Sequence, residues 1–149
     1  MRFSAPSDVS SITDRGLVKV VITTYGVLHG APPAGDMLTV DLSRALRNPH
    51  HDPQMKYKTG LDRQVRDHVM ATPGATEIRD RTVDRIEAAR VFHDMHGEIT
   101  EVGIYCKGGR HRSVAIAEAV AVELRARGIN TEVEHRDIDK PVVATPKNK

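Results

Sequence analysis

Apolar residues in this chain gather in short runs and in helically spaced repeats, which polar stretches containing Gly and Pro separate. Four runs are short and rich in β-branched residues, which is typical of buried strands. They are Leu17–Thr24, Met37–Leu42, Thr100–Tyr105 and Thr131–His135. The pattern therefore predicts two strands in the first third of the chain and two in the last third.

Three other segments repeat their apolar residues at helical spacing, which predicts amphipathic helices. They are Gly60–Met70, Thr76–His96 and Arg112–Arg127. The second is expected to end at Gly97 and the third at Gly128, because glycine commonly follows a helix. The residues expected to face the core are Leu61, Val65 and Val69 in the first, Ile78, Val83, Ile86, Ala89 and Met95 in the second, and Val114, Ala117, Val120, Ala121 and Leu124 in the third.

The order of these elements predicts the fold class. A strand, a loop, a helix and a strand follow one another from Thr100 to His135, which is a βαβ unit with parallel strands and a right-handed connection. We expect a single α/β domain over residues 16–140, with a mostly parallel sheet of about four strands. Residues 1–15 and 141–149 are expected to be flexible ends.

Composition narrows the functional classes. The 149 residues include 3% aromatics and no Trp, which argues against a base-stacking platform for single-stranded nucleic acid. The net charge of +2 is too small for a general nucleic-acid binder, so any anion binding must come from a local patch. A lone cysteine, Cys106, excludes a disulfide within the chain and suits a reducing compartment. With no signal-peptide pattern and no apolar run of membrane-spanning length, we expect a cytoplasmic protein that does not contact membranes.

The segment most informative about chemistry is the loop Tyr105–Ser113, YCKGGRHRS, between a predicted strand and a predicted helix. Backbone N–H groups and the helix dipole favour an anion there, and two glycines allow the backbone to approach it closely. Lys107, Arg110 and Arg112 add three cations, with no acidic residue between Glu101 and Glu118. Ser113 can cap the helix or donate its hydroxyl to a ligand. The loop therefore predicts a phosphate site at the carboxyl end of a strand.

Two other interpretations of this loop stay open. One is a glycine-rich turn whose cations are only solvated. The other rests on Cys106, Gly109, Arg112 and Ser113, which match C-x-x-G-x-x-R-[ST] and resemble the signature of cysteine-dependent phosphatases. In that chemistry a thiolate attacks phosphorus while loop N–H groups and the arginine hold the oxygens. No Asp is identifiable as the general acid, and a small buried cysteine at a strand end is the simpler account of Cys106. The loop is not a Walker A motif.

Five strings run along the chain in one order and together resemble the C-terminal domain of the RapZ family of RNase adaptor proteins. They are Asp41, Asn48-Pro49-His50, Thr59-Gly60-Leu61-Asp62, the loop from Cys106 to Ser113, and His135-Arg136-Asp137. The loop that holds His29 is also similar. The resemblance covers about Val18 to Lys140, and the family's N-terminal P-loop kinase-like domain is missing from this sequence.

The resemblance implies a domain that binds a hexosamine phosphate, with glucosamine-6-phosphate as the family's ligand. It also implies RNA and RNase contacts and self-association. By position, His50 matches the family's ligand-contacting histidine, and Gly108, Gly109 and Arg112 match its phosphate loop. Lys107 stands where a threonine is expected, so a charged contact replaces a hydroxyl contact. The basic residues near the C-terminus are scattered, and a solubilising end is the simpler interpretation of them than an RNA-binding patch.

We therefore predict a non-catalytic, regulatory module for a phosphorylated metabolite, without cofactor or metal. Arg112, Lys107 and the N–H groups of Gly108 and Gly109 would hold the phosphate, and His50 would orient the rest of the ligand. The alternatives are a cysteine-dependent phosphatase and an RNA-binding adaptor without a metabolite. The predicted binding set is His50, Lys107, Gly108, Gly109, Arg110, His111, Arg112 and Ser113, with His29, Asp41, Asn48, Thr59 and Asp62 in support.

Overall fold

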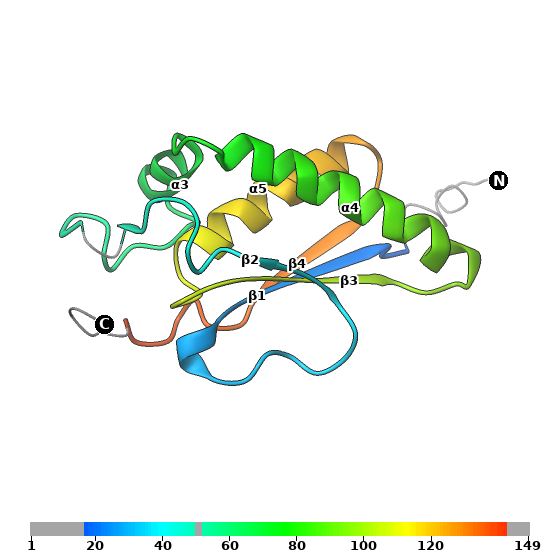
Figure 1. The fold of residues 1–149 in the computed structure, drawn as a ribbon, viewed down its shortest axis with the longest axis horizontal. Coiled ribbons are helices and arrows are strands. Elements are labelled where there is room, and N and C mark those ends of the chain that lie inside the picture. The colour runs from blue at the N-terminus through cyan, green and yellow to red at the C-terminus, as the bar shows by residue number, and fades with distance from the viewer. Residues whose placement is uncertain (1–16, 50–51, 143–149) are drawn as a thin grey trace.

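Four strands form one fully parallel sheet in the computed structural model, which describes residues 17–49 and 52–142 (Figure 1). The strands are β1 (Val20–Gly26), β2 (Leu38–Asp41), β3 (Thr100–Cys106) and β4 (Thr131–His135). Their order across the sheet is β2-β3-β1-β4, and each neighbouring pair is parallel. The predicted α/β class and parallel four-stranded sheet are confirmed. Because β1 lies between β3 and β4, the βαβ unit from Thr100 to His135 passes over one strand instead of joining neighbours.

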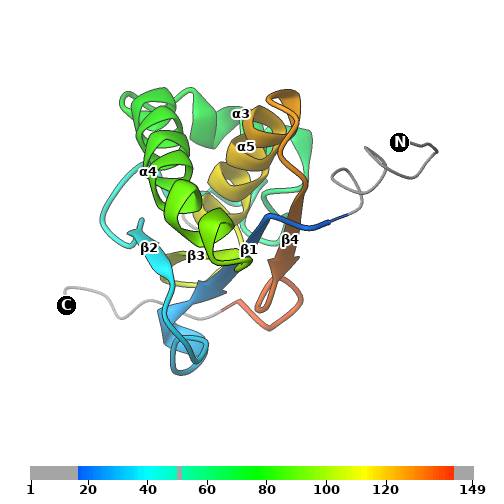
Figure 2. The same cartoon turned by 90° about the vertical axis from the view of Figure 1, so that its right-hand side faces the viewer.

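Three helices lie over one face of this sheet, as the two views of the ribbon show (Figures 1 and 2). They are α3 (Arg63–Met70), α4 (Ala75–Met95) and α5 (Arg112–Ala126), and a short 3₁₀ turn, η1 (Val27–His29), follows β1. Helix α5 is central, because it contacts α3, α4, β1, β3 and β4. All five of its residues predicted to face the core are buried. None of the helices in the described ranges has the length and apolar character needed to cross a bilayer.

Two residues predicted to lie in the core are instead exposed. Met95 is 77% exposed, because it follows Ile86 by nine residues and a helix turns about 100° per residue, which places the two on opposite sides of α4. Leu61 is 51% exposed, because α3 begins only at Arg63 and helical spacing does not apply before it.

The parallel register brings the carboxyl ends of all four strands to one edge of the sheet. Gly26 is the register partner of Cys106, and Asp41 is that of Tyr105. On the other side of β1, Thr24 is the partner of His135. Parallel α/β sheets commonly bind ligands at this edge, so the segments that follow the four strands are the ones to inspect.

Candidate functional site

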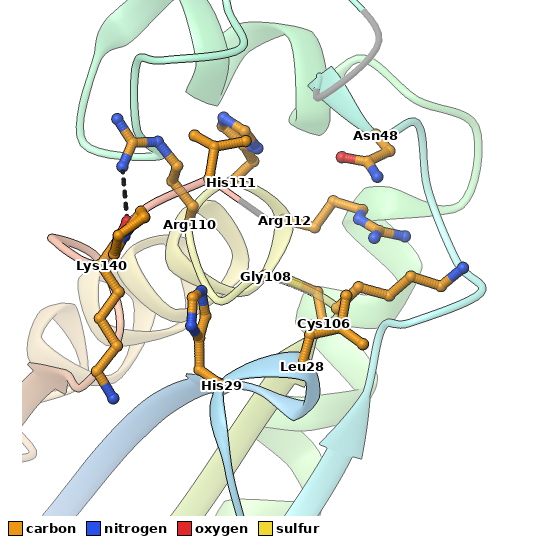
Figure 3. Close-up of a pocket in the computed structure, with 12 residues that line it drawn as sticks. Leu28, His29, Asn48, Cys106, Gly108, Arg110, His111, Arg112 and Lys140 are labelled. Carbon is orange, nitrogen blue, oxygen red and sulfur yellow. Dashed lines mark hydrogen bonds between the residues drawn. The ribbon is translucent and has the colours of Figure 1, made fainter. Parts of the chain in front are cut away.

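The segments that follow all four strands meet in one pocket at the carboxyl edge of the sheet (Figure 3). β1 leads to η1, β2 to the segment that ends at Asn48, β3 to the glycine loop, and β4 to the last described residues. The pocket is lined by Leu28, His29, Asn48, Cys106, Lys107, Gly108, Arg110, His111, Arg112, Lys140, Pro141 and Val142.

This pocket brings together much of the predicted site. Five of the predicted loop residues line it: Lys107, Gly108, Arg110, His111 and Arg112. Cys106 and two of the predicted supporting residues, His29 and Asn48, line it as well. Gly109 and Ser113 are buried and do not line the pocket, and neither do Asp41, Thr59 and Asp62. His50 lies outside the described residues.

Arg112 is the most unusual side chain in the pocket, because it is a cation that is only 4% exposed. It lies on the first turn of α5, and its Nη1 group donates to the carbonyls of Leu42 at 2.9 Å, Ala45 at 3.2 Å and Ser43 at 3.3 Å. Its buried Nε–H has no acceptor among the described residues. Burial lowers the pKa of the guanidinium, which the nearby Cys106 and Asp41 partly oppose. A buried cation without a carboxylate partner is costly, so an anion in the pocket would be favourable.

Cys106 lies at the end of β3, and its side chain is buried against the glycine loop. Its Sγ accepts the N–H of Gly109 at 3.3 Å and lies 3.3 Å from the Ser113 hydroxyl, to which the thiol can donate. Ser113 does not cap α5, because the residue at the cap is His111 and no side chain caps that end. The hydroxyl of Ser113 therefore interacts with Cys106 and does not cap the N-terminus of α5.

Arg110 is a structural clamp at one side of the pocket. Its Nε donates to the carbonyl of Lys58 at 3.1 Å, and its Nη2 donates to that of Tyr57. Its Nη1 donates to the carbonyls of Ile138 at 3.1 Å and Lys140 at 3.5 Å, the second of which is drawn in Figure 3. The guanidinium thus ties the segment before α3 to the segment after β4.

His111 is buried beside Arg110, and burial together with the arginine charge lowers the pKa of the imidazole to about 4. The ring is therefore neutral near pH 7. Its Nε2 lies 3.1 Å from the carbonyl of Lys56 and donates to it. His111 consequently adds no positive charge to the pocket, and the cations of the loop are Lys107, Arg110 and Arg112.

The predicted supporting residues outside the pocket shape the segments around it. Asp41 accepts the backbone N–H of Ser43 at 2.8 Å and its hydroxyl at 2.6 Å, and these bonds lower the pKa of Asp41. Thr59 does not cap α3 directly. Its backbone N–H donates to Asp62 at 2.7 Å, and its hydroxyl accepts the N–H of Leu61 at 3.1 Å. The adjacent Gly60 touches the start of α5, where an added Cβ would lie 2.6 Å from the backbone nitrogen of Ala115.

Two groups of residues that were not predicted from the sequence complete the site. Leu28 follows β1, and its N–H donates to the carbonyl of Lys107 at 3.0 Å. Lys140, Pro141 and Val142 follow β4 and line the pocket. Their position in the sequence could have identified them, because each of these residues comes shortly after a predicted strand, and the carboxyl ends of parallel strands commonly form binding sites.

The pocket suits a small anion or an anionic group on a larger ligand. Its described lining includes Lys107, Arg110, Arg112 and Lys140 and no carboxylate. It also includes Gly108, where an added Cβ would meet nothing within 4 Å, so the backbone is open to a ligand on that side. Leu28, Pro141 and Val142 give part of the wall an apolar character. Cationic groups around an accessible glycine backbone at a helix N-terminus are typical of phosphate sites.

The chain is similar to several known proteins. A family model described as the RapZ C-terminal domain matches residues 18–139. Similar curated proteins include three named nucleotide-binding proteins. That of Streptomyces coelicolor is 36% identical over 124 residues, which cover 83% of this chain and 41% of that protein. That of Thermotoga neapolitana is 35% identical over 132 residues, with 88% and 46% covered, and that of Rubrobacter xylanophilus is 40% identical over 129 residues, with 83% and 42% covered. The chain spans less than half the length of these relatives.

Proposed function

The chain belongs to the RapZ C-terminal domain family, and on that premise we propose that it is a non-catalytic module that binds a phosphorylated small metabolite. Arg112 and Lys107 are the cations that face the phosphate, and the open backbone of Gly108 supplies an N–H group. The N–H of Gly109 is already bound to the Cys106 Sγ, so the predicted contact from Gly109 is not available. Glucosamine-6-phosphate is the first ligand to test, because it is the ligand that the family resemblance implies.

The observation that carries the proposal is the unpaired Nε–H of Arg112. The side chain is almost completely buried, lines the pocket, and has this donor without an acceptor among the described residues. Leaving a buried donor unpaired costs about 1–3 kcal/mol. A phosphate oxygen would remove that cost and would also balance the charge.

The test is a calorimetric titration of the protein with four probes: glucosamine-6-phosphate, glucose-6-phosphate, inorganic phosphate and ATP. ATP is included because the relatives are named nucleotide-binding proteins. We expect binding of at least one phosphorylated probe and none of unphosphorylated glucosamine. Weaker binding by Lys107→Met, with no change in Lys58→Met, supports the site, because Lys58 is an exposed lysine outside the pocket lining. Absence of binding to all four probes would refute the proposal.

A second candidate, a cysteine-dependent phosphatase, is favoured by one observation. Cys106 lines the pocket, and its Sγ accepts a loop N–H, as a phosphatase nucleophile would. Against it, the described lining holds no carboxylate to protonate a leaving group. Release of p-nitrophenol from p-nitrophenyl phosphate by the wild type, with loss in Cys106→Ser, would favour this candidate over the binding module.

RNA, RNase and a second copy of the chain are the partners that the family resemblance implies. A regulatory module would use them to report ligand occupancy. Titration of a structured RNA across a salt series, with and without glucosamine-6-phosphate, tests this part of the proposal, since electrostatic RNA binding weakens as salt increases.

A further inference from the structure

Asp137 is a fully buried carboxylate directly behind the glycine loop, two residues after β4. Its Oδ2 accepts the backbone N–H of Gly26 at 2.8 Å. Arg136 donates to Oδ1 through Nε at 3.0 Å and to Oδ2 through Nη2 at 2.9 Å. The Nζ of Lys140 lies 2.5 Å from Oδ1. Burial alone would raise the pKa of Asp137, but these donors hold it well below its usual range, so the group is ionised.

Gly26 links Asp137 to the glycine loop, because the backbone of Gly26 is in direct contact with the backbones of Gly108 and Gly109. A Cβ built on Gly26 would lie 2.3 Å from the carbonyl carbon of Gly108 and 2.6 Å from the nitrogen of Gly109. A Cβ built on Gly109 would lie 2.5 Å from the nitrogen of Gly26 and 3.1 Å from the Cβ of Asp137. No side chain separates the loop from the N–H group that Asp137 holds, so a shift of Gly26 must displace Gly108 and Gly109.

The same carboxylate also fixes the opposite wall of the pocket through Lys140. The backbone N–H of Lys140 donates to the carbonyl of Asp137 at 3.1 Å, and its side chain ends on the carboxylate. Arg110, from the loop itself, holds the carbonyls of Ile138 and Lys140. Figure 3 shows Lys140 and Arg112 on opposite sides of the pocket. The loop and the segment after β4 therefore hold each other, with Asp137 at their junction.

We propose that Asp137 is the positioning residue of this anion site, and that it sets affinity for phosphate by fixing the Gly108–Gly109 backbone through Gly26 without touching the ligand. The inference rests on the proposed function. The negative charge behind an anion site is tolerable because Arg136 and Lys140 neutralise it. Preorganised donors bind more tightly than mobile ones, because ordering them costs free energy at the moment of binding.

The test compares three variants in the full chain. Asp137→Ala removes the acceptor, Asp137→Asn keeps an oxygen for the Gly26 N–H but removes the charge, and Asp139→Ala changes an exposed aspartate two residues away. Binding of inorganic phosphate and glucosamine-6-phosphate is measured at a temperature at which circular dichroism shows each variant folded. The amide resonances of Gly26, Gly108 and Gly109 are followed by NMR. Those of Gly108 and Gly109 decide, since the Gly26 amide loses its acceptor in any case, whereas a merely structural role would lower stability without moving the other two.

We expect Asp137→Ala to shift these three amide resonances and to weaken phosphate binding about tenfold or more, because small misplacements of binding groups are costly. Asp137→Asn should weaken it less than about threefold, because a neutral acceptor still holds Gly26. Asp139→Ala should bind as the wild type does. If Asp137→Ala does not fold, Asp137→Asn decides. Displaced Gly108 and Gly109 resonances with a measurable loss of affinity support positioning, whereas displaced resonances with wild-type affinity, or a large loss of affinity with unmoved resonances, overturn it.

Failure of the inference can be told apart from failure of the proposed function. If the wild type binds phosphate and folded Asp137→Ala binds it equally well, Asp137 has no positioning role although the site exists. If the wild type binds none of the probes, the phosphate site itself is wrong.

Discussion

The Nη1 group of Arg112 donates to the carbonyl of Leu42 at 2.9 Å, joining two residues that are 70 positions apart. Two further carbonyls of the same segment, those of Ser43 and Ala45, share this group. A residue predicted as a phosphate ligand is therefore also a structural support for the segment that leads from β2 to Asn48. Its Nη1 is used by the protein, and its Nε is the donor without a described acceptor.

This double role predicts that substitutions of Arg112 affect stability and binding differently. Arg112→Ala should lower the free energy of unfolding by about 3 kcal/mol, because it leaves buried carbonyls without a donor and creates a cavity. Arg112→Lys should keep more of that stability but bind phosphate about tenfold more weakly, because an ammonium lacks the planar fork of a guanidinium. Urea denaturation and calorimetry measure the two effects separately.

The control for Arg112 is Arg63→Ala, because the Arg63 side chain is 86% exposed and pairs with Asp67 at the helix surface. It should change the free energy of unfolding by less than about 0.5 kcal/mol. Wild-type phosphate affinity in Arg112→Lys would contradict the role assigned to the guanidinium.

His111 predicts a pH dependence of stability. Its pKa is about 4 in the folded protein, whereas an unperturbed histidine has a pKa of 6.5. Between these values the unfolded chain binds more protons, so stability is fully present above about pH 6.5 and falls as the pH drops toward 4. At 1.36 kcal/mol per pKa unit the loss is on the order of 3 kcal/mol.

The measurement is urea denaturation at pH 7, 6, 5 and 4 for the wild type, His111→Gln and His96→Gln. Glutamine can still donate to the Lys56 carbonyl but does not titrate, so His111→Gln should lose less stability than the wild type over this range. His96 is exposed and serves as the matched control, which should follow the wild type. Parallel curves for the wild type and His111→Gln would show that the ring is not held neutral.

The sequence predicted the local elements of the fold well, because strand and helix signals are local. The four strands, the three helices and the place of the glycine loop between β3 and α5 all follow from periodicity and turn residues. Met95 and Leu61 were predicted to face the core because of their helical spacing. The spacing misled for Leu61 because α3 begins only at Arg63, and for Met95 because it lies nine positions after Ile86, on the opposite side of α4.

The parts of the site that the sequence could not predict depend on contacts between distant segments. The bond between Gly26 and Asp137 joins residues 111 positions apart, and no local pattern marks the aspartate as its partner. Likewise, the loop sequence suggests that Arg110 binds a ligand, whereas the structure shows its donors on the backbone carbonyls of Tyr57, Lys58, Ile138 and Lys140. The order of strands in the sheet decides which segments meet, and that order is not a property of any single segment.

Gly108 and Gly109 are predicted to differ sharply in their tolerance to alanine. Gly109 has a φ of +69° and an added Cβ would strike the backbone of Gly26, so Gly109→Ala should cost about 2 kcal/mol or more of unfolding free energy. An added Cβ on Gly108 meets nothing within 4 Å, so Gly108→Ala should fold with nearly wild-type stability. Because Gly108 lines the pocket, its alanine variant should still bind phosphate more weakly.

Thermal denaturation and phosphate titration of both glycine variants check this pair. A Gly108→Ala variant as unstable as Gly109→Ala would contradict the open space beside Gly108. Unchanged phosphate affinity in Gly108→Ala would show that the ligand does not approach this part of the loop.

Cys106 offers a readout of the site without any substitution, because it is the only cysteine in the chain. Its side chain is 2% exposed, and its Sγ is engaged by Gly109 and Ser113. A thiol reagent such as dithionitrobenzoate can reach it only when the loop opens. Cys106 should therefore react more slowly in the folded protein than in the denatured chain, by a factor equal to the fraction of molecules in which the loop is open.

Phosphate or glucosamine-6-phosphate should slow the reaction of Cys106 further in the wild type, because a bound anion stabilises the closed loop. The Lys107→Met variant should lose this protection and Lys58→Met should keep it. A reaction rate in the folded protein equal to that of the denatured chain would contradict the burial of the thiol, and a rate insensitive to every phosphorylated probe would place the ligand elsewhere.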